Sequence, residues 1–140
     1  MTDEKIKHLE MIQRIITRMN TNSFQIKAFT ITVLSALLAL YARSNNQHYV
    51  LVGIASTCIF WALDAFYLQQ ERKFRGLYND AISDTPTHLI RNFSMPLHLY
   101  QGDKYTYFRS LASRTLLGFY LMITLCLITL LLTTNPLPHQ

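Results

Sequence analysis

Residues that commonly carry catalysis or hold metals are scarce in this sequence. Its four glycines are scattered at positions 53, 76, 102 and 118, which excludes a glycine-rich phosphate loop. Both cysteines, Cys58 and Cys126, lie inside apolar runs, which favours small buried residues over a disulfide or a metal site. Ser110 and Ser113 have no obvious histidine and acid partners for nucleophilic catalysis. No two of the five histidines have metal-ligand spacing on a common helix face. We therefore expect no metal site, no cofactor and no enzymatic activity.

Charged residues are also few. They make up 15% of the sequence, against about 25% in a typical soluble domain, whereas hydrophobic residues make up 50%. The formal net charge is +5, and the basic residues flank apolar runs. This pattern favours the anionic headgroups of a lipid bilayer over nucleic acid as a partner, and we expect no nucleic-acid binding. We expect an all-α membrane protein in which residues 1–140 form a single membrane domain.

Three apolar runs are long enough to cross a bilayer. Residues 24–42 and 50–68 comprise 19 residues each, and residues 115–134 comprise 20. A transmembrane helix needs at least about 17 residues. Lys27 is the only charge in the first run and Asp64 the only charge in the second. The first two spans should form an antiparallel hairpin, because only a short polar turn separates them.

Residues 1–22 have the pattern of an amphipathic helix. Thr2 or Asp3 can cap its start, and Asn20–Ser23 is expected to break it from the first span. The helix could lie on lipid headgroups or pack against protein. Its apolar residues recur at intervals of three and four: Ile6, Leu9, Ile12, Ile16 and Met19.

The polar region between the second and third spans should be partly helical. The helix of the second span is expected to continue into the cytoplasm to about residue 81, followed by a cytoplasmic loop over 82–103. A last helix, capped by Asp103, is expected over 104–134 and contains the third span. Residues 135–140 are a short polar end.

The distribution of lysine and arginine predicts the orientation. Five of the 13 lie in the N-terminal segment through Lys27, seven lie between Arg72 and Arg114, and one, Arg43, lies in the first turn. This distribution places the N-terminus and the long loop in the cytoplasm and the C-terminus outside.

Lys27 and Asp64 are expected to meet. Both lie roughly 5–6 Å inside the cytoplasmic boundary of their spans, at 1.5 Å of rise per residue. Pairing would offset the cost of an acid within an apolar span. The alternatives are that Lys27 reaches toward the headgroups or pairs with another chain, and that Asp64 serves an ion or proton pathway.

The second span's helix continues into a charged and aromatic stretch. Asp64, Glu71, Arg75 and Tyr78 share one helical face. The stretch could be a solvated surface with Glu71 and Arg75 as an i,i+4 pair, or a cytoplasmic docking surface for Arg18, for the long loop or for a partner. The candidate residues for docking are Arg18, Glu71, Arg72, Phe74, Arg75 and Tyr78.

Hydroxyl residues within the spans have two interpretations. They could line a pore, or they could bond the backbone of their own helix or a neighbouring helix, which we favour. They are Thr30, Thr32, Ser35, Ser56, Thr57, Thr124 and Thr129.

Several blocks of the sequence resemble a known family. These blocks are RMxxNSFxxK at 18–27, FWxLDxFYLxxERxFRxLY at 60–78, FSM at 93–95, and SRT with a following FY at 113–120. Together they are similar to a family of small, uncharacterised bacterial inner-membrane proteins. The resemblance implies an α-helical, multi-pass protein of the bacterial inner membrane and brings no assigned activity. Such proteins are often encoded near bacterial defence genes, which by analogy suggests a membrane-acting effector in phage defence.

Three functions follow as hypotheses. The first is an oligomeric effector that perturbs the membrane on a cytoplasmic signal, sensed by residues 1–22 and 69–114. The second is a non-conducting anchor or scaffold subunit that presents the same surface to a cytoplasmic protein partner. The third is a small ion-coupled transporter subunit that uses Asp64. Three spans bury little surface in one protomer, so a homo-oligomer or a membrane complex is expected.

Overall fold

The computed structural model describes residues 1–134, and the polar end over 135–140 lies outside the described residues. The described chain is helical and contains no strand. Its elements are α1 (Asp3–Ser44), α2 (His48–Ile82), the 3₁₀ turns η1 (Leu97–Leu99) and η2 (Asp103–Tyr105), α3 (Tyr107–Leu111) and α4 (Arg114–Thr134).

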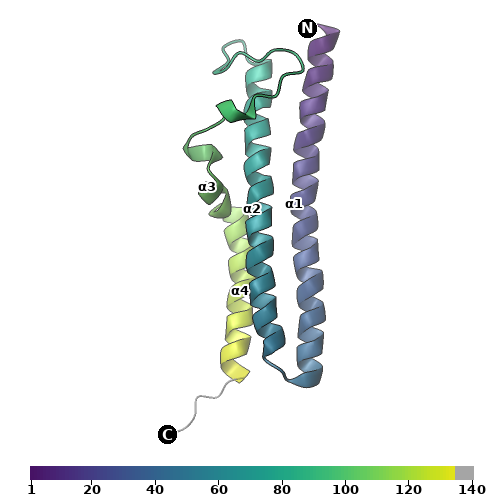
Figure 1. The fold of residues 1–140 in the computed structure, drawn as a ribbon, viewed down its shortest axis with the longest axis vertical. Helices are drawn as coiled ribbons and strands as arrows, with labels where there is room; N and C mark the ends of the chain where they lie inside the picture. Colours follow the sequence, from purple (N-terminus) through teal and green to yellow (C-terminus); the bar gives the residue numbers. More distant parts are fainter. Residues whose placement is uncertain (135–140) are drawn as a thin grey trace.

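Three helices are long and apolar enough to cross a membrane: α1, α2 and α4. Figure 1 shows them side by side, with α2 between α1 and α4, and α2 packs against both. At about 1.5 Å per residue, the 21 residues of α4 match a hydrocarbon core of about 30 Å. The 42 residues of α1 and the 35 of α2 are longer than this core requires, and both project beyond α4 at the same end of the molecule.

The expected break between an N-terminal helix and the first span is absent. α1 continues through Asn20–Ser23 without interruption, and Thr2 is the N-cap, accepting a hydrogen bond from Lys5 N. The reason lies in packing: Ile16 and Ile26 are buried on either side of the polar stretch, and Ser23 itself is buried. Tertiary burial therefore outweighs the weak helix propensity of these residues.

The helix hairpin agrees with the sequence analysis more closely. α1 ends at Asn45, which has a left-handed backbone (φ 52°) and donates its N–H to Tyr41 O, a common way for asparagine to end a helix. α2 ends at Ile82, close to the expected end near residue 81.

The continuous helix expected over 104–134 is also absent. η2 and α3 are separate short elements, and α4 begins only at Arg114. Asp103 does not cap the last helix; it starts η2 and its carboxylate pairs with Arg109. Ser113 caps α4 instead, because its Oγ accepts a hydrogen bond from Leu116 N at 3.3 Å.

The protruding ends of α1 and α2 pack against each other and against the loop. Ile12 and Ile16 of α1 form one apolar cluster with Phe74 and Leu77 of α2 and Tyr100 of the loop. The N-terminal part of α1 is thus packed against protein, which was one of the two alternatives for this segment. We call residues 3–22 and 69–113 the headpiece, and residues 23–68 and 114–134 the span region.

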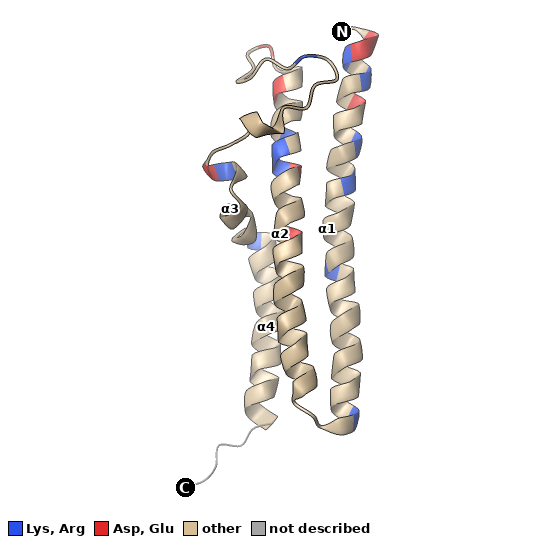
Figure 2. Cartoon of the chain, viewed as in Figure 1, with Lys and Arg blue, Asp and Glu red and all other residues tan. Residues whose placement is uncertain are grey.

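Charge divides the molecule along the same line (Figure 2). The span region contains only Lys27, Arg43, Asp64 and Arg114, and the other charged side chains of the described chain all lie in the headpiece. Lys27 and Asp64 lie near the junction of the two parts.

Candidate functional site

Asp64 is the centre of a buried polar cluster where the three long helices meet. It lies in the middle of α2 and is 0% exposed. Lys27 of α1 donates from Nζ to Asp64 Oδ2 at 2.5 Å, so the two charges expected to meet are in contact. Tyr120 of α4 donates its hydroxyl to the same oxygen at 3.0 Å. One carboxylate therefore bonds both neighbouring helices.

Ser23 completes the cluster. Its hydroxyl donates to Asp64 Oδ1 and accepts from Lys27 Nζ at 3.0 Å. Both oxygens of the carboxylate thus have donors, and among residues 1–134 no buried side-chain nitrogen or oxygen lacks a hydrogen-bond partner. An unpaired acid at the centre of a span costs about 2.5–3.5 kcal/mol on insertion scales, and this set of donors offsets that cost.

Sequence reasoning did not identify Ser23 and Tyr120 as partners of Asp64. Ser23 was interpreted as part of a helix break, and Tyr120 carries no charge that would mark it. No local sequence pattern marks either residue as a partner of Asp64. The α4 side of the cluster is reinforced by Trp61, whose ring stacks on Tyr120 with centroids 6.2 Å apart.

The seven serine and threonine residues considered for pore lining bond within their own helices. Each of the seven residues donates to the carbonyl four positions earlier, as in Thr30 to Ile26 O at 2.8 Å. This confirms the interpretation that we favoured over pore lining. Within one protomer, the described span region therefore offers no row of free hydroxyls to water or ions.

The six residues considered as a docking surface differ in exposure. Phe74 and Glu71 are 9% and 8% exposed, so they belong to the interior of the protomer. Glu71 pairs with Arg75 across one helical turn at 2.7 Å, as its i,i+4 spacing allows. Tyr78 packs on the headpiece core, and Arg18 is exposed on α1. Arg72 and Arg75 line a cleft beside the loop.

Three hydrogen bonds of 3.0 Å or shorter fasten the segment 102–111 to α2. Gln69 Nε2 donates to Tyr105 O at 2.9 Å, Tyr107 Oη donates to Ala62 O at 2.9 Å, and Trp61 Nε1 donates to Leu111 O at 3.0 Å. The segment that joins the headpiece to α4 is therefore held to α2 along its length.

Tyr100 anchors the rest of the loop. Its ring lies in the headpiece core and its hydroxyl donates to Asp80 Oδ2 at 2.8 Å. Burial, together with this hydrogen bond and the charge of Asp80, raises the pKa of the Tyr100 hydroxyl well above its ordinary value. Tyr100 thus remains neutral and acts as a donor over the physiological range.

The histidines of the described chain have packing roles where their contacts are clear. His8 is buried and its Nε2 lies 3.1 Å from Ser94 O, and the His88 ring packs edge-on against Tyr100. Within residues 1–134, no three histidine, cysteine, aspartate or glutamate side chains are grouped so that they could hold a metal ion.

The fold and the polar cluster define an all-helical protein with three helices capable of crossing a membrane and a charged helical headpiece at one end. Comparisons with protein-family models, with curated proteins and with solved structures find no match.

Proposed function

We propose that this protein is a multi-pass effector of the bacterial inner membrane that perturbs the bilayer in response to a cytoplasmic signal. In this proposal the headpiece and the N-terminus lie in the cytoplasm and the C-terminus lies outside, as the distribution of lysine and arginine predicts. The separation of charge between headpiece and span region supports that orientation. A role in phage defence is part of the proposal and rests on the family resemblance alone.

The observation that carries the proposal is the polar cluster at the junction of headpiece and spans. α1 and α2 run without interruption from one part into the other, and Asp64 bonds α1 and α4 at that level. A displacement of the headpiece would therefore be transmitted to all three spans. Ion pairs with discrete partners can act as such two-state elements.

The proposal requires more than one copy of the chain. Asp64 is fully hydrogen-bonded and the span hydroxyls bond their own backbones, so a single protomer offers no polar route through its described span region. Perturbation of the bilayer would then need several protomers. The mass of the detergent-solubilised protein tests this requirement, and a monomer would leave no plausible pore.

The test of the effector proposal is the membrane potential of bacteria on induced expression, followed with a voltage-sensitive dye. Wild-type protein should depolarise the cells, whereas Lys27→Ala and Asp64→Ala should abolish the effect because the three spans lose their common contact. Thr32→Val is the matched control, since Thr32 is exposed and bonds only its own helix. The amount of each variant in the membrane fraction must be equal. An unchanged potential with abundant wild-type protein would refute the proposal.

A non-conducting anchor or scaffold subunit is the second candidate. The observation that favours it is the same saturation of polar groups, which suits a passive bundle as well as a closed effector. In that case expression leaves the potential intact and the headpiece serves a cytoplasmic protein partner. An ion-coupled transporter is disfavoured, because the carboxylate that would carry the ion is already bonded by three side chains. Proton or ion flux in liposomes that depends on Asp64 would reverse this ranking.

A further inference from the structure

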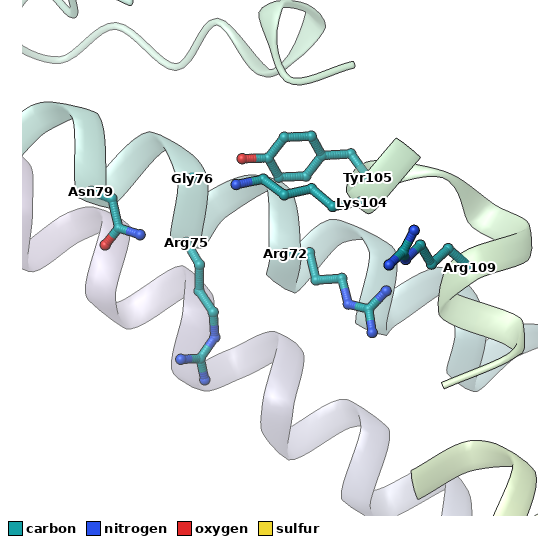
Figure 3. Close-up of a pocket in the computed structure, with 7 residues that line it drawn as sticks. All are labelled: Arg72, Arg75, Gly76, Asn79, Lys104, Tyr105 and Arg109. Atoms are coloured by element: carbon teal, nitrogen blue, oxygen red, sulfur yellow. The ribbon is translucent and has the colours of Figure 1, made fainter. Parts of the chain in front are cut away.

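The headpiece contains a basic cleft of about 360 Å³ between α2 and the segment 102–111 (Figure 3). Arg72 and Arg75 come from α2, Lys104 comes from η2, and Arg109 comes from α3. In the close-up, the Arg72 and Arg109 side chains extend toward each other, and Lys104 runs along Tyr105. The fold thus brings basic side chains from three separate elements to one cleft.

Positive charge in this cleft exceeds the acids that neutralise it. Arg75 pairs with Glu71, and Arg109 pairs with Asp103. Within the described chain, Arg72 and Lys104 form no ion pair. Arg72 has only a long hydrogen bond to Ser110 Oγ, 3.5 Å, and the Lys104 ammonium lies over the Tyr105 ring. No carboxylate lines the cleft.

The walls of the cleft are held in place by close packing. A Cβ at Gly76 would lie 2.4 Å from Tyr105 Oη and 2.8 Å from Tyr100 Cδ1, so only glycine allows both rings to seat on α2. The backbone of Tyr105 is also bonded by Gln69. Lys104 therefore stays beside Arg72 and Arg109 despite their mutual repulsion, which is the arrangement expected of a pre-formed anion site.

We propose that this cleft binds a phosphate-bearing anion. Guanidinium groups match phosphate oxygens in pairs, and lysine adds a point charge, so Arg72, Arg109 and Lys104 suit a doubly charged phosphate. The position of the cleft relative to the expected bilayer suits two sources of phosphate. Arg72 is four residues beyond Leu68, about 6 Å above the expected hydrocarbon boundary and within the headgroup layer. A phosphate can therefore enter as a lipid headgroup or as a soluble phosphate ester.

This inference rests on the proposed function only for the role of the bound anion, which would be the cytoplasmic signal of the effector. Binding itself is independent of membrane perturbation. If the protein binds phosphate but leaves the membrane potential intact, the anion site stands and the effector proposal is refuted.

The test uses the full chain in neutral phosphatidylcholine nanodiscs. Calorimetric titration with inorganic pyrophosphate measures the soluble source, and the thermal midpoint in nanodiscs with and without phosphatidylglycerol measures the lipid source. We expect at least one of these to give saturable binding or stabilisation. Arg72→Gln with Lys104→Gln should weaken it about tenfold or more for each lost cation, because charged hydrogen bonds contribute that much.

Lys7→Gln with Arg91→Gln is the matched control. It removes one lysine and one arginine from exposed positions away from the cleft, so net charge falls equally. An effect of pyrophosphate alone identifies a soluble phosphate, and an effect of phosphatidylglycerol alone identifies a lipid. No effect of either anion, or equal losses in both double variants, would overturn the proposal.

Discussion

The span region and the headpiece treat their polar groups in opposite ways. In the span region, Asp64 has a donor for each oxygen, and the seven serine and threonine hydroxyls considered for pore lining bond their own helices. In the headpiece, Arg72 and Lys104 face a cleft without an acidic partner. Lipid offers no hydrogen bonds to an unsatisfied group, whereas water or an anion does. The buried cluster therefore joins the three long helices, whereas the proposed anion recognition belongs to the headpiece.

The largest expected effect comes from breaking the ion pair on one side. Lys27→Met should leave Asp64 buried and short of its cation, at a cost of about 3–5 kcal/mol in the free energy of unfolding. Lys27→Met combined with Asp64→Leu should cost less than the single change, because no buried charge remains. Denaturant unfolding in detergent micelles measures both. A double variant that loses as much stability as Lys27→Met, or more, would show that the pair does not act as a unit.

A medium effect is expected where the headpiece seats its loop. Gly76→Ala places a methyl group against Tyr100 and Tyr105 and should cost about 1–3 kcal/mol, as overpacking does in cores. The loss should be confined to the headpiece, so limited proteolysis should accelerate within residues 83–113 while the spans stay protected.

Gly118→Ala is the control for that prediction, since a Cβ there meets nothing within 4 Å. It should leave the proteolysis pattern unchanged. Equal cleavage of wild type and Gly76→Ala would contradict the tight packing of the two tyrosines on Gly76. It would also count against the inference that the cleft is pre-formed.

The same contrast explains what could be predicted from sequence. The spans follow from long apolar runs, and the Lys27–Asp64 contact follows from two opposite charges at equal depth in a hairpin. Tyr120 could not be assigned to Asp64, because nothing in the sequence of α4 fixes which of its faces meets α2. The prediction of a helix break at Asn20–Ser23 was wrong, because local helix propensity does not reveal that Ser23 is buried and hydrogen-bonded to Asp64.

The headpiece was less predictable for a related reason. Its cleft depends on the Tyr100 and Tyr105 rings packing against Gly76, and both rings come from a loop whose sequence has no regular periodicity. The boundary between α3 and α4 at Ala112–Ser113 carries neither glycine nor proline, and only the cap from Ser113 marks it. When an irregular segment packs against a helix that is distant in sequence, the local sequence pattern does not predict the contact.

The smallest expected effect concerns the hydrogen bond from Tyr100 to Asp80. Tyr100→Phe removes the hydrogen bond to Asp80 and should cost about 0.5–1.5 kcal/mol, with the ring packing retained. Because the folded protein raises the pKa of the Tyr100 hydroxyl, the unfolded chain ionises first, near its ordinary pKa of about 10. The stabilisation is therefore complete below pH 10 and is lost as the pH rises above it.

The pH dependence separates this contact from simple packing. Wild type should lose stability between about pH 10 and 11 more steeply than Tyr100→Phe, which has no hydroxyl to ionise there. Thermal unfolding of both proteins in the same detergent at matched pH values measures the difference. Parallel curves would mean that burial and Asp80 do not hold the Tyr100 hydroxyl neutral in the folded protein.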